Sequence, residues 1–147
     1  MNIVIEESIL INANIEKVWE IFTDLTCWKD WNTVMRNVNS DEKYLSNGGK
    51  ISCSFRPFLL PVKATIMVEE VIPLKRIVWS AKKKGFSTRN KFTFQGNEKG
   101  VLVTSRETYS GLLVRSFGFI LPKRKMQTLI KTFLRNLKIA SENEPNP

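Results

Sequence analysis

The residue in this sequence that is best placed to do chemistry is Glu107. It belongs to an alternating stretch whose inward side chains are predicted to be Val103, Ser105, Glu107 and Tyr109. A carboxyl group in apolar surroundings must find a polar partner or raise its pKa. Three roles therefore remain open for Glu107: a structural hydrogen bond or ion pair, for example with Asn90 or Tyr109, orientation of a polar group on a ligand, or general acid–base catalysis.

The sequence offers few other routes to catalysis. It contains no histidine, which removes the Ser-His and Cys-His pairs that activate nucleophiles. Cys27 and Cys53 alone make a poor zinc site, and we expect both to be free thiols, with Cys53 acting as a small buried hydrophobic residue. No glycine-rich nucleotide loop of the GxGxxG or Walker type occurs. We therefore expect no cofactor and no metal, and we favour a protein that is not an enzyme, with Glu107 as a weak catalytic candidate.

The longest periodic stretch runs from Gly111 to Ser141 and predicts a C-terminal helix. Its apolar residues recur at i, i+4, i+7 and i+11 and fall on one face, in the set Met126, Ile130, Phe133 and Leu137. Pro122 lacks an amide hydrogen and should begin or kink the main helix. A shorter apolar piece, Leu112–Leu121, is expected to lead into the main helix from Lys123.

Upstream of this helix, the sequence predicts a strand, two short helices and about six more strands. The first strand is expected at Glu6–Asn12, Asn14 as the N-cap of the first helix, and Asp24 or Thr26 as the cap of the second. The later strands are predicted at Met35–Asn39, Lys50–Arg56, Val62–Ile72, Arg76–Lys82, Ser87–Gln95 and Val101–Ser110. Short turns between them indicate an antiparallel meander. The expected fold is α+β, a curved antiparallel sheet of about seven strands wrapped around the C-terminal helix, in one domain over residues 1–147 with a disordered tail at 142–147.

The net charge of +9 is concentrated in two places, the basic C-terminal helix and Lys82-Lys83-Lys84. A solvated surface is the default interpretation, and a face that meets anionic lipid is the alternative. The apolar loop tip Phe58-Leu59-Leu60 could cover a cavity or insert transiently into such a membrane. Nucleic acid is not the expected partner, because the tryptophans look buried rather than interleaved with basic residues. The chain starts without a signal-peptide pattern and is expected to be cytoplasmic.

Several short motifs follow one another along the chain. They include Val18-Trp19-Glu20-Ile21-Phe22-Thr23-Asp24, Trp28-Lys29-Asp30-Trp31-Asn32, Gly48-Gly49-Lys50-Ile51 and Arg106-Glu107-Thr108-Tyr109-Ser110-Gly111-Leu112-Leu113. In this order they resemble the helix-grip fold of the START/Bet v 1-like superfamily, and in detail its SRPBCC, or polyketide cyclase/dehydrase-like, branch. The resemblance covers residues from about Ser8 to Ala140. Members often carry a histidine at the positions of Asn90 or Ser105, and its absence here weakens any histidine-based catalytic interpretation.

The resemblance implies a hydrophobic cavity between the sheet and the C-terminal helix. With the alternation of the strands, the expected ligand-binding residues are Ile51, Cys53, Phe55, Trp79, Asn90, Phe92, Phe94, Val103, Ser105, Glu107, Tyr109, Met126, Ile130, Phe133 and Leu137. The expected function is binding or carriage of a hydrophobic small molecule, such as a lipid, isoprenoid or polyketide. The alternatives are a polyketide cyclase- or dehydratase-like enzyme using Glu107, and a module that docks on a membrane or partner through the basic helix. Solid packing of Trp79 and Phe92 against Phe133 that leaves no room for a guest beneath the helix would contradict the carrier hypothesis.

Overall fold

A computed structural model of the chain describes residues 3–56, 61–83, 86–111 and 123–143. The elements are β1 (Ile3–Ile11), α1 (Ile15–Thr23), the 3-10 turn η1 (Leu25–Cys27), α2 (Trp28–Trp31), β2 (Arg36–Asn39), β3 (Lys50–Phe55), β4 (Val62–Ile72), β5 (Arg76–Lys83), β6 (Phe86–Asn97), β7 (Gly100–Ser110) and α4 (Lys123–Asn143). The strands form one antiparallel sheet of seven strands in the order β1-β7-β6-β5-β4-β3-β2. The α+β class predicted from the sequence is therefore confirmed.

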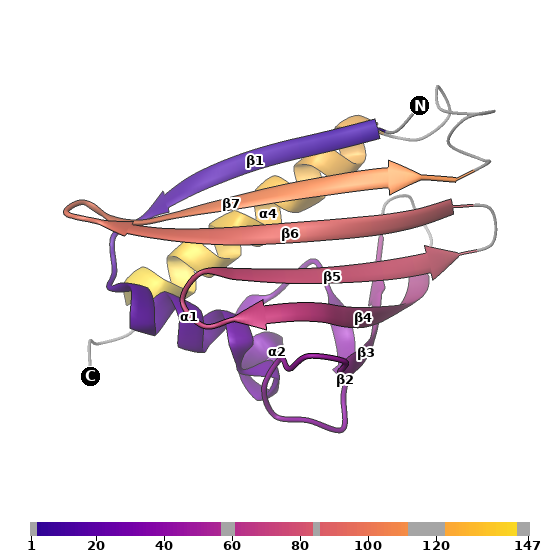
Figure 1. The fold of residues 1–147 in the computed structure, drawn as a ribbon, viewed down its shortest axis with the longest axis horizontal. Helices are drawn as coiled ribbons and strands as arrows, with labels where there is room; N and C mark the ends of the chain where they lie inside the picture. The colour runs from indigo at the N-terminus through magenta and orange to yellow at the C-terminus, as the bar shows by residue number, and fades with distance from the viewer. Residues whose placement is uncertain (1–2, 57–60, 84–85, 112–122, 144–147) are drawn as a thin grey trace.

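The sheet curves around α4, which crosses one of its faces diagonally (Figure 1). The helix starts beside the beginning of β1 and ends close to α1 (Figure 1). Its buried stripe contains Ile130, Phe133, Leu134 and Leu137, whereas Met126 keeps part of its surface accessible. The described part of α4 begins at Lys123, the residue from which the main helix was expected, and Pro122 itself lies outside the described residues. The expected apolar piece Leu112–Leu121 and the loop tip Phe58-Leu59-Leu60 lie outside the described residues.

Helix α1 and the turn η1, which leads into α2, form where the sequence supplies their caps. The Asn14 side chain accepts a hydrogen bond from the backbone amide of Lys17 at 2.9 Å, which satisfies a free donor at the start of α1. Asp24 ends α1 and, through its carboxylate, accepts from the Thr26 amide at 3.0 Å at the start of η1. Of the two predicted caps for the second helical segment, Asp24 is the one used. The two caps direct α1 and α2 against the same face of the sheet as α4.

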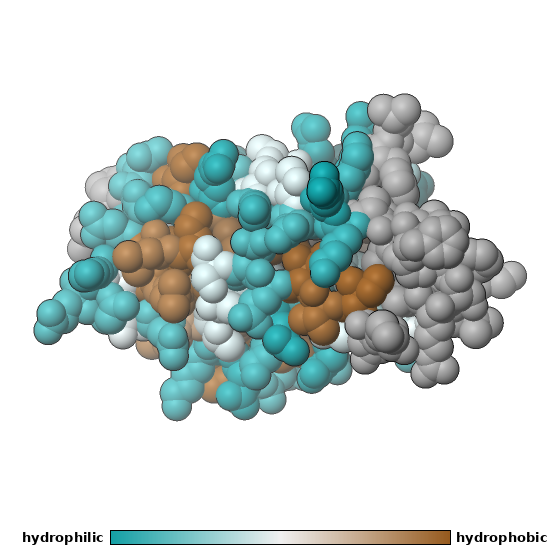
Figure 2. Space-filling model, turned by 90° about the horizontal axis from the view of Figure 1, so that it is seen from above, coloured by the Kyte–Doolittle hydropathy of each residue, from teal (hydrophilic) through white to brown (hydrophobic). Residues whose placement is uncertain are grey.

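The face formed by β1 and α4 is mainly hydrophilic but contains two apolar areas (Figure 2). Leu10 and Ile139 are the large apolar side chains of these two elements that the structure describes as exposed. Exposed basic side chains at the start of α4 are Lys123, Arg124 and Lys125. No helix among the described residues is both long and apolar enough to cross a bilayer.

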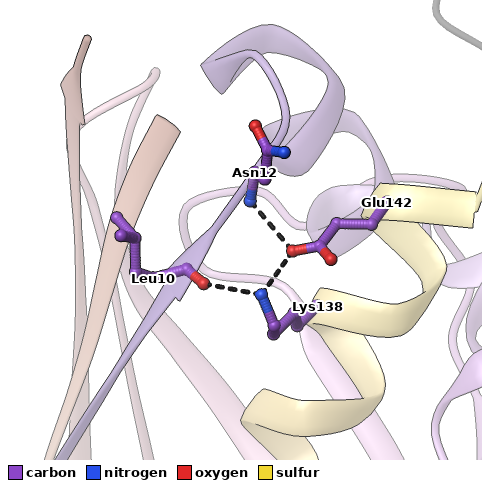
Figure 3. Close-up of polar contacts among 4 residues, drawn as sticks. All are labelled: Leu10, Asn12, Lys138 and Glu142. Atoms are coloured by element: carbon purple, nitrogen blue, oxygen red, sulfur yellow. Dashed lines mark hydrogen bonds and ion pairs between the residues drawn. The ribbon is translucent and has the colours of Figure 1, made fainter. Parts of the chain in front are cut away.

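The last turns of α4 cap the end of β1 (Figure 3). The Glu142 carboxylate accepts from the Asn12 amide at 2.9 Å, and Lys138 Nζ donates to the Leu10 carbonyl at 3.0 Å. Lys138 Nζ also lies 2.5 Å from Glu142 Oε2, so the two side chains hold each other in place. Since β1 is an edge strand, these contacts occupy backbone groups that another strand could otherwise pair with. They also correct the expectation of disorder at residues 142 and 143, which belong to α4; residues 144–147 lie outside the described ranges.

Candidate functional site

The candidate site is built on the inner face of the sheet, where the strand register places Glu107 among apolar neighbours. Glu107 lies opposite Ile5 of β1 and opposite Asn90 of β6. Asn90 in turn lies opposite Trp79 of β5. In β7, alternate residues Val103, Ser105 and Tyr109 are buried and Arg106 is exposed, so Glu107 projects toward the side that carries α4.

Four polar side chains form a chain of hydrogen bonds on this inner face. Glu107 Oε2 accepts from Asn90 Nδ2 at 3.0 Å, and Glu107 Oε1 accepts from the Tyr109 hydroxyl. Asn90 Oδ1 accepts from Ser105 Oγ at 3.1 Å. Among the ion pairs of the described residues, none involves Glu107. The carboxyl is therefore satisfied by two neutral donors rather than by a basic side chain.

This environment changes how Glu107 and Tyr109 titrate. Burial raises the pKa of Glu107 to about 7, and the hydrogen bond from Tyr109 opposes part of that rise. Burial and the nearby Glu107 carboxylate raise the pKa of the Tyr109 hydroxyl far above its usual range. The Glu107 carboxyl is desolvated, although the residue as a whole keeps part of its surface accessible. It can therefore gain or lose a proton near neutral pH, as a general acid or base must.

The region between the sheet, α1 and the C-terminal half of α4 is filled by aromatic rings. Phe22 of α1 has no exposed surface, and its ring centroid lies 4.9 Å from Phe92, 5.6 Å from Phe133 and 5.8 Å from Trp79. Phe92 and Phe133 are themselves 5.6 Å apart. These distances correspond to direct ring packing. The space between Trp79, Phe92 and Phe133 is therefore core, which corrects the expectation that these three residues surround an open cavity.

The remaining predicted lining residues are distributed over the same inner surface. Phe94 packs against Phe22 at 5.4 Å and belongs to the aromatic core. The other apolar residues predicted to line the cavity that are buried are Ile51, Cys53, Val103, Ile130 and Leu137. Phe55 and Met126 stay partly exposed. The predicted lining thus divides into a packed end near α1 and a more accessible end near Glu107.

At the accessible end, three positions on the inner face carry small side chains, whereas the packed end near α1 is filled by aromatic rings. Thr88 lies opposite Tyr109, and Ala81 lies opposite Thr88, so both share the inner face with the polar chain. Ala64 of β4 lies opposite Cys53 on the same face. Thr88, Ala81 and Ala64 all keep accessible surface. Small residues at these positions fill less of the interval between sheet and helix than the rings at the packed end do.

A second concave feature, which the sequence did not predict, is a pocket of about 430 Å³ between α1, α2 and the C-terminal half of α4. It is lined by Glu20, Ile21, Asp24, Cys27, Asp30, Trp31, Asn136, Ile139, Ala140 and Asn143. Two of its carboxylates have local partners, since Asp24 accepts from Thr26 and Glu20 accepts from the Tyr44 hydroxyl. Its residues come from two stretches far apart in the sequence, 20–31 and 136–143, so no local pattern predicts it.

Metal and thiol chemistry find little support in the described part of the chain. Cys27 and Cys53 are free, as expected. Burial raises the pKa of the Cys53 thiol to about 11, which keeps it protonated and unreactive. Within residues 3–56, 61–83, 86–111 and 123–143, no group of three or more histidine, cysteine, aspartate or glutamate side chains is arranged to hold a metal ion.

A curved antiparallel sheet that wraps a long C-terminal helix defines the helix-grip fold of START/Bet v 1-like proteins. The chain belongs to the family described as "Polyketide cyclase / dehydrase and lipid transport", which it matches over residues 2–142. The resemblance inferred from the sequence motifs is thereby confirmed. No functionally curated protein is significantly similar in sequence.

Solved structures share this fold at low sequence identity. A hypothetical protein from Helicobacter pylori is 16% identical, with a TM-score of 0.74 and coverage of 96% of this chain and 88% of that one. The di-domain ARO/CYC StfQ from the steffimycin biosynthetic pathway is 13% identical, with a TM-score of 0.77, 97% coverage of this chain and 51% of that one. The di-domain ARO/CYC BexL from the BE-7585A biosynthetic pathway is 16% identical, with a TM-score of 0.74, 98% coverage of this chain and 51% of that one. At these identities the likeness establishes the fold.

Proposed function

We propose that the protein binds or carries a hydrophobic small molecule between the sheet and the N-terminal half of α4, at the end that contains Glu107. The observation that carries this proposal is the position of Glu107 on the inner face, where its carboxyl is hydrogen-bonded to Asn90 and Tyr109 among apolar neighbours and part of the residue stays accessible. A desolvated carboxyl in such a wall suits a polar group that orients a ligand in an enclosed site.

The wall composition supports the same proposal. Apolar side chains dominate the inner face, and the polar ones are concentrated in the chain Ser105–Asn90–Glu107–Tyr109. Sites for small apolar ligands combine such walls with a few polar groups that orient the ligand. The aromatic core around Phe22 closes the other end, so the proposed space is smaller than the full interval between sheet and helix. The family description, which includes lipid transport, agrees with a ligand of this kind.

A neutral fluorescent probe tests the proposal directly. Diphenylhexatriene should bind the wild-type protein at one site per chain and should be displaced by other apolar molecules. Ala81→Trp adds an indole on the inner face and should weaken probe binding at least about tenfold, because the added ring occupies the proposed space. Lys82→Trp, on the adjacent outward position, should bind the probe like wild type. No probe uptake by the wild type, or equal loss in both variants, would contradict the proposal.

Acid–base catalysis is the second candidate function, because Glu107 titrates near neutral pH and is hydrogen-bonded to Tyr109. A cyclase- or dehydratase-like reaction would use Glu107 to move a proton on a ligand held by Asn90 or Tyr109. Apolar compounds that copurify with the protein should be incubated with wild type and with Glu107→Gln and followed by mass spectrometry. Loss of one water from the compound with wild type alone would favour catalysis. Recovery of the compound unchanged from both would favour carriage.

A further inference from the structure

The polar chain around Glu107 specifies what kind of head group a ligand can carry. We propose that the ligand presents a hydrogen-bond donor, a hydroxyl or an amine, to the Glu107 carboxylate, and that the site rejects apolar molecules with an anionic head group. This inference rests on the proposed binding function and names the ligand class for that same site.

The first argument is the direction of the hydrogen bonds. Ser105 Oγ donates to Asn90 Oδ1, and this bond orients the amide so that Asn90 Nδ2 donates to Glu107 Oε2. The opposite amide orientation would place two acceptors, Asn90 Oδ1 and Glu107 Oε2, against each other. The Tyr109 hydroxyl donates a hydrogen bond to Glu107 Oε1. These bonds use the Ser105 and Tyr109 hydroxyl protons and one of the two hydrogens on Asn90 Nδ2, so a ligand meets mainly acceptor lone pairs on Glu107 and Tyr109, with one Asn90 N–H as the remaining donor.

The second argument is charge. Inward-facing neighbours of Glu107 in the register are the uncharged Ile5, Thr88, Ala81 and Trp79, and the acidic Glu7, which lies opposite Ser105. Among the inward-facing side chains that the structure describes, none near Glu107 is basic. Of the basic residues of α4 on the β1 side, Lys131 is largely exposed and lies 4.0 Å from Glu7, and Lys138 pairs with Glu142. A carboxylate head group would therefore be buried beside an acid with no compensating cation.

Protonation of Glu107 weakens this selectivity without reversing it. A neutral carboxyl would add one donor and remove the repulsion between like charges, but it would supply no cation to pair with an anionic head group. An ammonium group, by contrast, would form an ion pair with the carboxylate, and a hydroxyl would form a charge-assisted hydrogen bond. The chemistry of the polar chain consequently favours apolar alcohols and amines over fatty carboxylates.

Competition among ligands with one alkyl chain and different head groups tests the inference. Dodecanol, dodecylamine, methyl dodecanoate and dodecanoate should each be titrated against bound diphenylhexatriene at about pH 8, below their micelle concentrations. The alcohol and the amine should displace the probe at concentrations at least about tenfold lower than dodecanoate, since a hydrogen bond to a charged group is worth about that factor or more. Methyl dodecanoate, an ester that lacks a donor, should displace the probe at concentrations between those needed for the alcohol and for dodecanoate.

Two variants separate the role of Glu107 from general packing. Glu107→Gln removes the negative charge and should bring dodecanoate to within about threefold of dodecanol. Tyr109→Phe retains the charge and should still reject dodecanoate, which keeps the inference testable if Glu107→Gln fails to fold. Wild-type preference for dodecanoate would overturn the inference and leave the binding function standing. Absence of probe uptake in the wild type would overturn both.

Discussion

The variant Phe22→Ala is expected to unfold with a free energy about 3–5 kcal/mol below that of the wild type, the cost of removing a large aromatic side chain from a packed core. Phe22 is fully buried, and its ring packs against Trp28, Trp79, Phe92, Phe94 and Phe133. Its removal leaves a cavity that these rings cannot refill without moving α1 away from the sheet. Urea unfolding followed by circular dichroism measures the difference.

Phe55→Ala is the matched control, because Phe55 is the same residue type at the accessible end of the inner face. Its loss should cost no more than about 2 kcal/mol, since part of the ring surface is not packed. The contrast between the two variants tests the division of the interior into a packed end and an accessible end. Equal costs for Phe22→Ala and Phe55→Ala would show that both ends are packed alike.

The second large effect concerns pH. Glu107 has a pKa of about 7 in the folded protein and an ordinary value of 4.5, so the folded state holds its proton more tightly than the unfolded state does. Stability from this residue is fully present below about pH 4.5, falls as the pH rises toward 7, and levels off above that. The difference between the two pKa values corresponds to a loss of about 3 kcal/mol across this interval.

The stability of Glu107→Gln should not fall in this pH interval, because glutamine does not titrate. Its amide can replace the hydrogen bond to Tyr109 and, after a flip of the Asn90 amide, the one to Asn90. Urea unfolding at about pH 5 and pH 8 should therefore show wild type losing about 3 kcal/mol relative to Glu107→Gln. Glu98→Gln, in the exposed turn between β6 and β7, should follow the wild-type profile. Parallel profiles for wild type and Glu107→Gln would mean that the carboxyl is hydrated in the folded protein.

The sequence predicted the fold closely because its local signals agree with the tertiary structure. Alternation in Val62–Ile72 and Val101–Ser110 marks β4 and β7 because one face of each strand is buried. Asn14 marks the start of α1, because its side chain accepts from a free backbone donor of the first turn. β1 starts at Ile3, earlier than predicted, because its pairing with β7 extends to Tyr109 and local alternation cannot reveal where a partner strand ends.

The site was predicted less completely than the fold. Alternation places Ser105, Glu107 and Tyr109 on one face, and the short turn between β6 and β7 brings Asn90 opposite Glu107, so both proposed partners of Glu107 were within reach of the sequence. The depth to which Phe22 enters the interior could not be predicted from the sequence. An amphipathic pattern identifies the buried face of α1 but not which rings of the sheet its side chains will meet.

The central claim is that accessible apolar space lies beside Glu107 and not within the aromatic core. Xenon enters empty apolar cavities, so diffraction from xenon-pressurised crystals locates such space directly. The structure predicts a xenon site in contact with Ala81 or Met126, near Glu107, and none among Phe22, Phe92 and Phe133. Absence of xenon beside Glu107, or its appearance only within the aromatic cluster, would contradict the claim.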